Sequence, residues 1–309
     1  MTSPTPRPDA LTTAAFAAVV VLGGANFLAV RVSNLELAPF WGAGLRFSLA
    51  ALVFVAIAGA LKLEIPRGRQ LALTALYGFF VVTLSYALMY WALVRVTAGT
   101  TTVILAMVPL ITGLLAAAQR LERLSARILL GAAIAFAGIV WMTVGPDGLA
   151  IPLDGLIAIV VAAVAIGQSV ILGKRVSSNH PVMTNAVGMS VGAPLLLVFS
   201  AIVGERWAIP GQTGTVLAVG YLVLLGSVGL FIFTLFVVRR WTASATSYAF
   251  VLFPVVTMLA EAWLMGEPLT VRGVLGALTV MSGVWFGAFS RSTTKPGEPS
   301  PALAPARAR

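Results

Sequence analysis

The chain of 309 residues contains no cysteine and a single histidine, His180. The lack of cysteine excludes disulfide bonds, thiol nucleophiles and cysteine-bound metals, and one histidine excludes a histidine-rich metal site; we expect no cofactor. Charged residues are also scarce, at 10% of the chain, whereas hydrophobic residues make up 59%. Soluble domains contain about 25% charged residues. The composition therefore excludes an ordinary soluble protein and indicates a chain that lies mostly in lipid.

Apolar runs long enough to cross a bilayer recur along almost the whole sequence. A helix of about 20 apolar residues crosses the hydrocarbon of a membrane, so these runs predict an all-α polytopic membrane protein. The ten predicted spans cover residues 11–32, 38–60, 70–94, 98–119, 127–145, 154–174, 182–204, 213–238, 242–264 and 270–290. Tryptophans near the span ends agree with these limits, because Trp prefers the headgroup level. The polar termini, 1–10 and 291–309, are expected to be disordered tails.

Basic residues are distributed unevenly between the two sides of such a ten-span chain. Fifteen of the 20 Lys and Arg residues fall on the side that holds both termini, four fall on the other side, and Arg46 lies within a span. An excess of Lys and Arg marks the cytoplasmic side. We therefore expect both termini to be cytoplasmic. The net charge of +10 then reflects topology, and no nucleic-acid partner is expected.

The sequence repeats itself at an offset of 145 residues, so that residues 95–141 align without a gap to residues 240–286. The identical pairs include Arg95/Arg240, Pro109/Pro254, Glu122/Glu267, Arg127/Arg272, Gly131/Gly276 and Gly138/Gly283. Each copy holds five spans, which is an odd number, so the second copy enters the membrane from the opposite side. Inverted repeats of this kind are typical of transporters. We place the two repeats at 11–145 and 154–290.

These features resemble those of a known family. The doubled five-helix unit, the prolines of the fourth and ninth spans, the glycine-bearing fifth helices, the Glu-x4-Arg loops and the Arg46–Phe47 pair resemble the EamA-type ten-helix members of the drug/metabolite transporter (DMT) superfamily. The resemblance covers 11–290. Within the family, the chain is most similar to bacterial exporters of aromatic amino acids and related metabolites, which implies a location in the inner membrane of a bacterium. The resemblance also implies a basket-like fold in which spans 1, 3, 4, 6, 8 and 9 surround a central cavity.

Polar and aromatic side chains within the spans are the candidates for contact with a substrate, because lipid disfavours them and a cavity wall does not. They cluster on the spans that the resemblance places around the cavity. The candidates are Asn26, Thr83, Tyr86, Tyr90, Thr101, Met107, Gln168, Ser169, Tyr221, Ser227, Thr246 and Tyr248. Each could instead join neighbouring helices by a hydrogen bond, and Tyr90 could belong to the interfacial aromatic belt beside Trp91.

Two charged residues lie within the spans, Arg46 in the second and Glu261 in the ninth. A charge at a helix centre costs about 2.5–3.5 kcal/mol on insertion scales. The two residues could form an ion pair, each could reach the interface, or Glu261 could couple transport to protons. Pro109 and Pro254 each remove a backbone hydrogen bond from their helices and are candidates for hinges or for static kinks.

A polar cavity with almost no fixed charge suits neutral or zwitterionic metabolites. We expect a transporter that exports amino acids, aromatic ones included, by alternating access, and that works in the lipid bilayer as a monomer or weak homodimer. The alternative is a proton-coupled multidrug exporter that uses Glu261. An enzyme is not expected, because Asp9, Asp147 and Asp154 lie in tails or at span edges and the sequence has no H-E-x-x-H motif.

Overall fold

The computed structural model describes residues 9–121, 124–145, 148–149, 151–240 and 243–289. Within these residues, eight helical segments are long and apolar enough to cross a membrane, and two shorter apolar helices bring the number to the ten predicted spans. The fold is therefore that of an all-α membrane protein, as the sequence predicts. The predicted tails fall almost entirely outside the described residues.

Six spans are single helices, and four are built from shorter pieces. The single helices are α1 (Ala10–Ser33), α2 (Pro39–Ala60), α7 (Ala126–Thr143), α8 (Leu153–Arg175), α9 (Pro181–Ile202) and α12 (Ala243–Met265). The third span comprises α3 (Gly68–Gly78), the π-helical turn η1 (Phe79–Leu84) and α4 (Ser85–Ala92). The fourth comprises α5 (Ala98–Leu105) and α6 (Val108–Ala118). The eighth comprises α10 (Thr213–Val223), the π-helical turn η2 (Leu224–Gly229) and α11 (Leu230–Arg240), and the tenth comprises α13 (Val271–Val284) and η3 (Trp285–Phe289).

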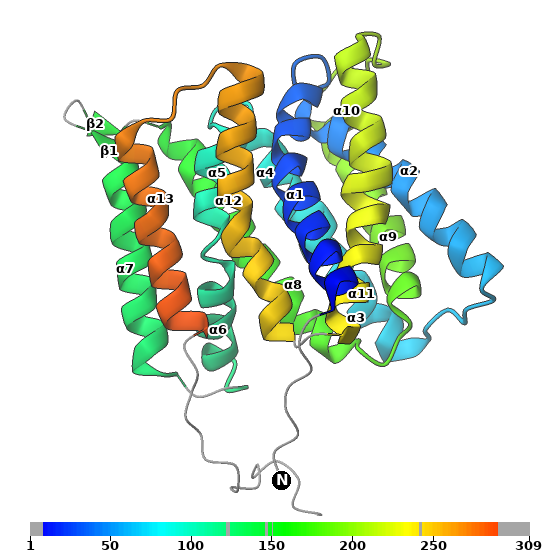
Figure 1. Ribbon diagram of the computed structural model, residues 1–309. Helices are drawn as coiled ribbons and strands as arrows, with labels where there is room; N and C mark the ends of the chain where they lie inside the picture. The colour runs from blue at the N-terminus through cyan, green and yellow to red at the C-terminus, as the bar shows by residue number, and fades with distance from the viewer. Residues whose placement is uncertain (1–8, 122–123, 146–147, 150, 241–242, 290–309) are drawn as a thin grey trace, which may run out of the picture.

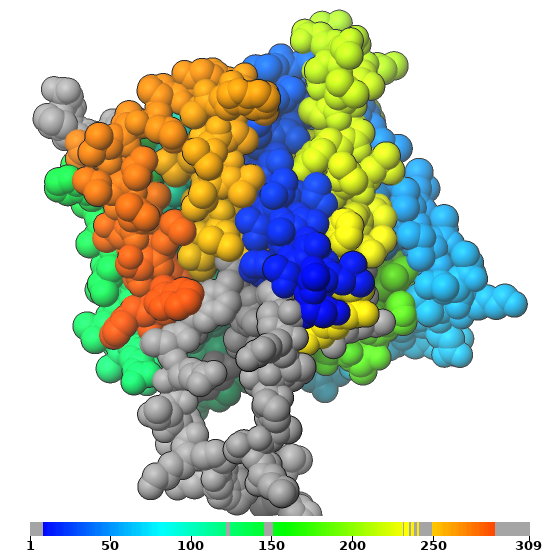
Figure 2. All heavy atoms as spheres, in the orientation of Figure 1, coloured from blue at the N-terminus to red at the C-terminus, as the bar shows by residue number. Residues whose placement is uncertain are grey.

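The helices stand side by side in one bundle, with α7 and α13 at one edge and α2 at the other (Figure 1). Between α7 and α8 the chain forms a small antiparallel hairpin of β1 (Val144–Gly145) and β2 (Gly148–Leu149). In Figure 2 the atoms of α1 and α12 meet along the front face. This contact depends on glycine, because a Cβ added to Gly24 of α1 would lie 2.6 Å from the Cβ of Val256 of α12.

The packing of α7 against α13 shows that the two repeats are inverted. A Cβ added to Gly131 would lie 2.6 Å from the carbonyl oxygen of Gly283, and one added to Gly138 would lie 2.9 Å from that of Gly276. Gly131 corresponds to Gly276 in the repeat, and Gly283 corresponds to Gly138, so the two contacts are equivalent. A two-fold axis therefore relates the two helices. An early residue of α7 meets a late residue of α13, which makes the helices antiparallel. The axis is therefore perpendicular to the spans and lies in the membrane plane.

Local features obey the same offset. The π-helical turn at 79–84 is repeated at 224–229. Helix α7 is capped by Ser125, whose side chain accepts a hydrogen bond from Ile128 N–H, and α13 by Thr270, whose side chain accepts one from Gly273 N–H. Ser and Thr are favoured at this position because their oxygen satisfies a backbone donor that the helix leaves free. Equivalent positions of the two repeats thus form the same helix caps and the same π-helical turns.

The two repeat-related prolines occupy different local structures. Pro109 lies in the first turn of α6, directly after the break between α5 and α6, where a missing N–H removes no helical hydrogen bond. Pro254 lies inside the continuous helix α12. The fourth span is therefore interrupted and the ninth is not. Their roles as hinges stay predictions.

Candidate functional site

A cavity of about 420 Å³ lies among the spans and is bordered by α1, α2, η1, α4, α5, α6, α8, α11 and α12. This volume is that of a small-molecule site. All six spans that the resemblance places around a cavity contribute to the wall, and α2 adds Arg46. Most of the wall is apolar, with the rings of Phe27, Tyr86, Phe250 and Phe253. Arg46 is the charged residue among the described lining residues, and its charge is positive.

Arg46 is almost completely buried, with 1% of its surface exposed. Its Nε atom donates to Ser227 Oγ at 3.2 Å, and its Nη2 atom donates to Asn26 Oδ1 at 3.3 Å and to the Gly226 carbonyl at 3.1 Å. The guanidinium also lies 5.2 Å from the ring centroid of Tyr86, within cation–π distance. These contacts stabilise a charge that lipid would reject and hold it at the cavity wall.

The π-helical turn η2 provides two of the three acceptors for this arginine, Ser227 Oγ and the Gly226 carbonyl. The Gly226 carbonyl, which lies in the turn, accepts from Arg46 and also from Asn26 Nδ2 at 3.1 Å. A Cβ at Gly226 would lie 2.2 Å from Asn26 Oδ1, so the approach of α1 to this turn requires glycine. π-Helical turns are frequent at functional sites, and this one joins α1, α2 and the eighth span at a single polar cluster.

Two polar atoms of this cluster lack a partner in the part of the chain that the structure describes. They are Arg46 Nη1 and Tyr90 Oη, and both are buried. The Tyr90 hydroxyl lies beside the Arg46 guanidinium, and the Tyr90 ring lies 6.4 Å from that of Tyr86. A buried charged donor without an acceptor is unfavourable by about 1–3 kcal/mol or more. The cluster is therefore incomplete as the chain alone forms it.

Of the residues predicted to contact a substrate, Asn26 and Tyr86 line this cavity. Ser227 and Tyr90 lie directly behind the wall, where Ser227 holds Arg46 and Tyr90 is fully buried. Tyr221 donates to the Leu22 carbonyl at 2.8 Å and so joins the eighth span to α1. The substrate contacts of all five residues stay predictions.

Five of the other candidates are not among the described lining residues. Thr83 donates to the Gly192 carbonyl of α9 at 3.3 Å. Thr101 and Ser169 donate to carbonyls of their own helices. Met107 packs against the core at the break before α6, and Gln168 is hydrogen-bonded to Gln119 at 2.7 Å. The side chains of Thr246 and Tyr248 lie outside the described residues.

Sequence analysis missed several residues of the wall. Ser85, Met89, Thr102 and Phe250 line the cavity. Thr102 follows the predicted Thr101 by one position, and its hydroxyl donates to the Gly99 carbonyl at 2.8 Å. Helix α5 contains three consecutive threonines, at positions 100–102. Their hydropathy is identical, so it cannot show which of them faces the cavity. That choice depends on the rotation of the helix about its axis.

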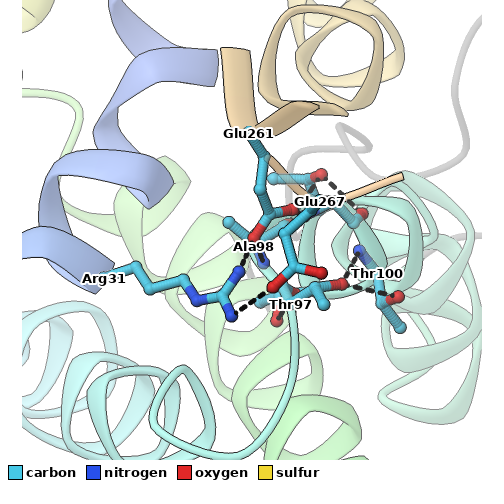
Figure 3. Close-up of polar contacts among 9 residues, drawn as sticks. Arg31, Thr97, Ala98, Thr100, Glu261 and Glu267 are labelled. Atoms are coloured by element: carbon cyan, nitrogen blue, oxygen red, sulfur yellow. Dashed lines mark hydrogen bonds and ion pairs between the residues drawn. The ribbon is translucent and has the colours of Figure 1, made fainter. Parts of the chain in front are cut away.

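Glu261 lies in a cluster of polar contacts where α5 begins (Figure 3). Its carboxylate accepts hydrogen bonds from the backbone N–H groups of Ala98 and Gly99 at 2.8 and 2.7 Å, and it forms an ion pair with Arg31. Arg31 also binds Glu267 at 2.8 Å. The N-terminus of α5 is a favourable place for a carboxylate because its N–H groups are free and the helix dipole is positive there. Glu261 thus joins α1, α5 and α12.

The two intramembrane charges do not pair with one another in this structure. Arg46 is bound by polar groups of α1 and η2, whereas Glu261 is bound by Arg31 and by α5. The pairing that the sequence left open is therefore wrong for this conformation. Glu261 is also not among the described residues that line the cavity.

The fold and the site can now be compared with known proteins. The model of the EamA-like transporter family matches the chain twice, at residues 11–144 and 153–288. A solved crystal structure shares the fold, with a TM-score of 0.65 over 90% of this chain and 96% of that chain, at 18% sequence identity.

Curated relatives are similar over most of their length. The uncharacterized inner membrane transporter YedA of Escherichia coli K12 is 30% identical over 82% of this chain and 82% of its own. A probable amino-acid metabolite efflux pump of Salmonella typhimurium is 28% identical over 88% of this chain and 92% of its own. A probable terminal-alkyne amino-acid exporter of Streptantibioticus cattleyicolor is 27% identical over 84% of this chain and 88% of its own. The chain therefore belongs to the EamA-like transporter family.

Proposed function

We propose that this protein exports amino acids and related zwitterionic metabolites through the cavity between its two repeats. The observation that carries the proposal is the wall of that cavity, which combines aromatic rings with one buried cation, Arg46. Apolar side chains of a substrate would pack on Phe27, Phe250 and Phe253, and its polar end would face Arg46. Two of the relatives named above are described as amino-acid exporters or efflux pumps, which supports the same class.

Alternating access is the mechanism that the inverted repeats favour. Two similar halves related by an axis in the membrane plane can exchange conformations, and the exchange opens the cavity at the opposite end. Glu261, Arg31 and the N-terminus of α5 hold the bundle together at one end. The repeat-equivalent position at the other end is Ala116, which cannot form such an ion pair. The two ends therefore differ in the strength of their closure.

The chain offers a complete cavity by itself, so we propose that a monomer suffices for transport and that no catalytic step is involved. The excess of Lys and Arg on the side of the termini supports an inner membrane location with cytoplasmic ends. In that orientation Glu261 and Arg31 lie at the periplasmic end. The ion pair then joins α1 to α12 at the periplasmic end.

The alternative, a proton-coupled multidrug exporter that uses Glu261, receives less support from the site. Glu261 is held by three donors that would have to be released in each cycle. The cavity also carries a positive charge at Arg46, which disfavours a cationic substrate. An amino acid presents both a carboxylate and an apolar group to this wall.

Counterflow in proteoliposomes tests the proposal. Purified protein is reconstituted into vesicles loaded with one unlabelled amino acid, and uptake of labelled leucine, phenylalanine, methionine or a cationic dye is followed. We expect uptake of at least one apolar amino acid and none of the dye, with protein-free vesicles as the control. Uptake of the dye alone would support the multidrug alternative, and uptake of neither would remove the proposal.

A further inference from the structure

The guanidinium of Arg46 has a free edge. A guanidinium carries five N–H donors, and Nε and Nη2 are used by Ser227, Asn26 and Gly226. The remaining nitrogen, Nη1, has no acceptor in the described part of the chain. The phenol oxygen of Tyr90, beside the same guanidinium, is likewise without a partner there. The phenol oxygen can accept as well as donate, and it lies close enough to interact with the Arg46 guanidinium, but no contact between the two has the distance and angle of a hydrogen bond. The two N–H groups of Nη1 and the O–H group of Tyr90 are therefore buried donors without an acceptor in the described part of the chain.

The positive charge of Arg46 is also uncompensated. Ion pairs between described residues join Arg31 to Glu261 and Glu267 and Arg95 to Asp154, and none of these three involves Arg46. All the acceptors that Arg46 does have are neutral oxygens. A buried cation of this kind is expected to be stable only when an anion or further acceptors complete its environment.

We propose that Arg46 Nη1, together with the Tyr90 hydroxyl, binds the carboxylate of the transported substrate. This inference rests on the proposed function and specifies its substrate class: a monocarboxylate with an apolar body. A carboxylate has two oxygens and one negative charge, which match the two groups that carry free donors, Nη1 and the Tyr90 hydroxyl, and the single cation. A phosphate dianion would require more positive charge than the described lining residues provide.

The surroundings fix the arginine in place. The rings of Phe47 and Tyr86 lie 4.9 and 5.2 Å from the Arg46 guanidinium carbon, and the polar acceptors of α1 and η2 hold its other edge. Asn26 and Ser227 are thus positioning residues, which orient Arg46 without needing to touch the substrate. An anchor held in this way loses little conformational freedom when the substrate binds.

Access to Nη1 depends on the conformation of the transporter. Arg46 is 1% exposed and Tyr90 is fully buried in this structure, although Arg46 borders the cavity. A carboxylate therefore reaches the free edge only when the wall relaxes around it. Binding of the substrate would then be linked to movement of the wall, which is the coupling that alternating access requires.

Matched ligands test the inference on the unmodified protein. In the counterflow assay, unlabelled leucine, leucinamide and 4-methylpentanoate are each tested for inhibition of the uptake of labelled leucine. If another amino acid is transported, its own amide and deaminated acid are used in the same way. The amide keeps the ammonium group and the apolar body but has no carboxylate, whereas 4-methylpentanoate keeps the carboxylate and has no ammonium group. We expect the amide to compete about 10-fold or more weakly than the amino acid, because a charge-assisted hydrogen bond is lost, and 4-methylpentanoate to compete within a few-fold.

Variants locate the effect. Tyr90→Phe removes one hydroxyl and should weaken competition by the carboxylates several-fold, while competition by the amide stays unchanged. Arg46→Gln should abolish the discrimination between acid and amide, and Arg46→Lys should keep part of it. Arg95→Gln, which changes an arginine paired with Asp154 and packed on Trp91, is the matched control and should leave the discrimination unchanged.

The outcomes separate the two proposals. If no amino acid is transported, the proposed function fails and the inference fails with it. If amino acids are transported but the amide competes as well as the acid, the inference alone is overturned and Arg46 is a structural residue. Because this comparison uses the unmodified protein, it decides the matter even if an Arg46 variant fails to fold.

Discussion

Glu261 of α12 forms an ion pair with Arg31 of α1 at the end of the bundle where α5 begins (Figure 3). The pair is largely enclosed: the Glu261 side chain is 4% exposed and that of Arg31 is 23% exposed. The same carboxylate caps α5 through Ala98 and Gly99. One side chain thus joins elements from both repeats, and its loss should be visible in stability and in conformation.

Glu261→Gln should lower the free energy of unfolding by about 1–3 kcal/mol, because an N-terminal cap and an enclosed ion pair are both weakened. Thermal unfolding in detergent measures this change. Glu64→Gln, at an exposed position between α2 and α3, is the control and should stay within about 0.5 kcal/mol of the unmodified protein. Equal stability of the two variants would show that Glu261 does not hold the bundle together.

Gly131→Ala should destabilise the α7–α13 contact by about 1–3 kcal/mol, because the new methyl group would lie 2.5 Å from the Cα of Gly287. Gly220→Ala in α10 is the matched control, since nothing lies within 4 Å of the added Cβ. The control should gain up to about 1 kcal/mol from helix propensity. Thermal midpoints of both variants measure the difference, and a stable Gly131→Ala variant would argue against this close packing.

The inverted topology predicts opposite accessibility for equivalent residues. Leu124 and Leu269 are separated by the repeat offset, and both are exposed, at 50% and 46%. Since the chain has no cysteine, Leu124→Cys and Leu269→Cys each introduce a unique thiol. In right-side-out vesicles an impermeant maleimide should label the second variant and not the first, and inverted vesicles should reverse the result. Labelling of both from one side would refute the inverted repeat.

Glu36, in the loop between α1 and α2, should make stability depend on pH. Hydrogen bonds from Gly211 N–H and from the side chain of Thr215 hold its pKa below the ordinary value of 4.5. A carboxylate with a lowered folded-state pKa stabilises the protein above the unfolded pKa, and this contribution is lost as pH falls through the folded pKa. Glu36→Gln should therefore lower the thermal midpoint at pH 7, and the difference should be smaller near pH 3. A constant difference at both pH values would contradict the assignment.

Much of the architecture follows from hydropathy and from the repeat. The ten spans were predicted within a few residues of their observed ends, because the length of an apolar run is set by the thickness of the bilayer. The odd number of spans in each repeat predicted their inversion, which the pairing of Gly131 with Gly283 confirms. Hydropathy did not reveal the π-helical turns η1 and η2, since their residues are as apolar as those of an α-helix.

The site was less predictable than the spans. Hydropathy identified Arg46, Asn26 and Tyr86 as unusual within their helices, and the structure places all three at the cavity. It could not assign Arg46 its partners, because Ser227 and Gly226 are about 180 residues away along the chain. Thr83 and Gln168 are also polar residues within apolar spans, but their side chains form hydrogen bonds to other helices and do not line the cavity.

Which segments cross the membrane and how the second repeat is oriented can be derived from the amino-acid sequence, because both depend on the summed hydrophobicity and on the parity of the spans. Which side chain faces the cavity and which partner holds each charge becomes known only from the packed helices. These choices depend on the rotation and close approach of helices, and glycines such as Gly226 and Gly24 set that approach only once their neighbours are known.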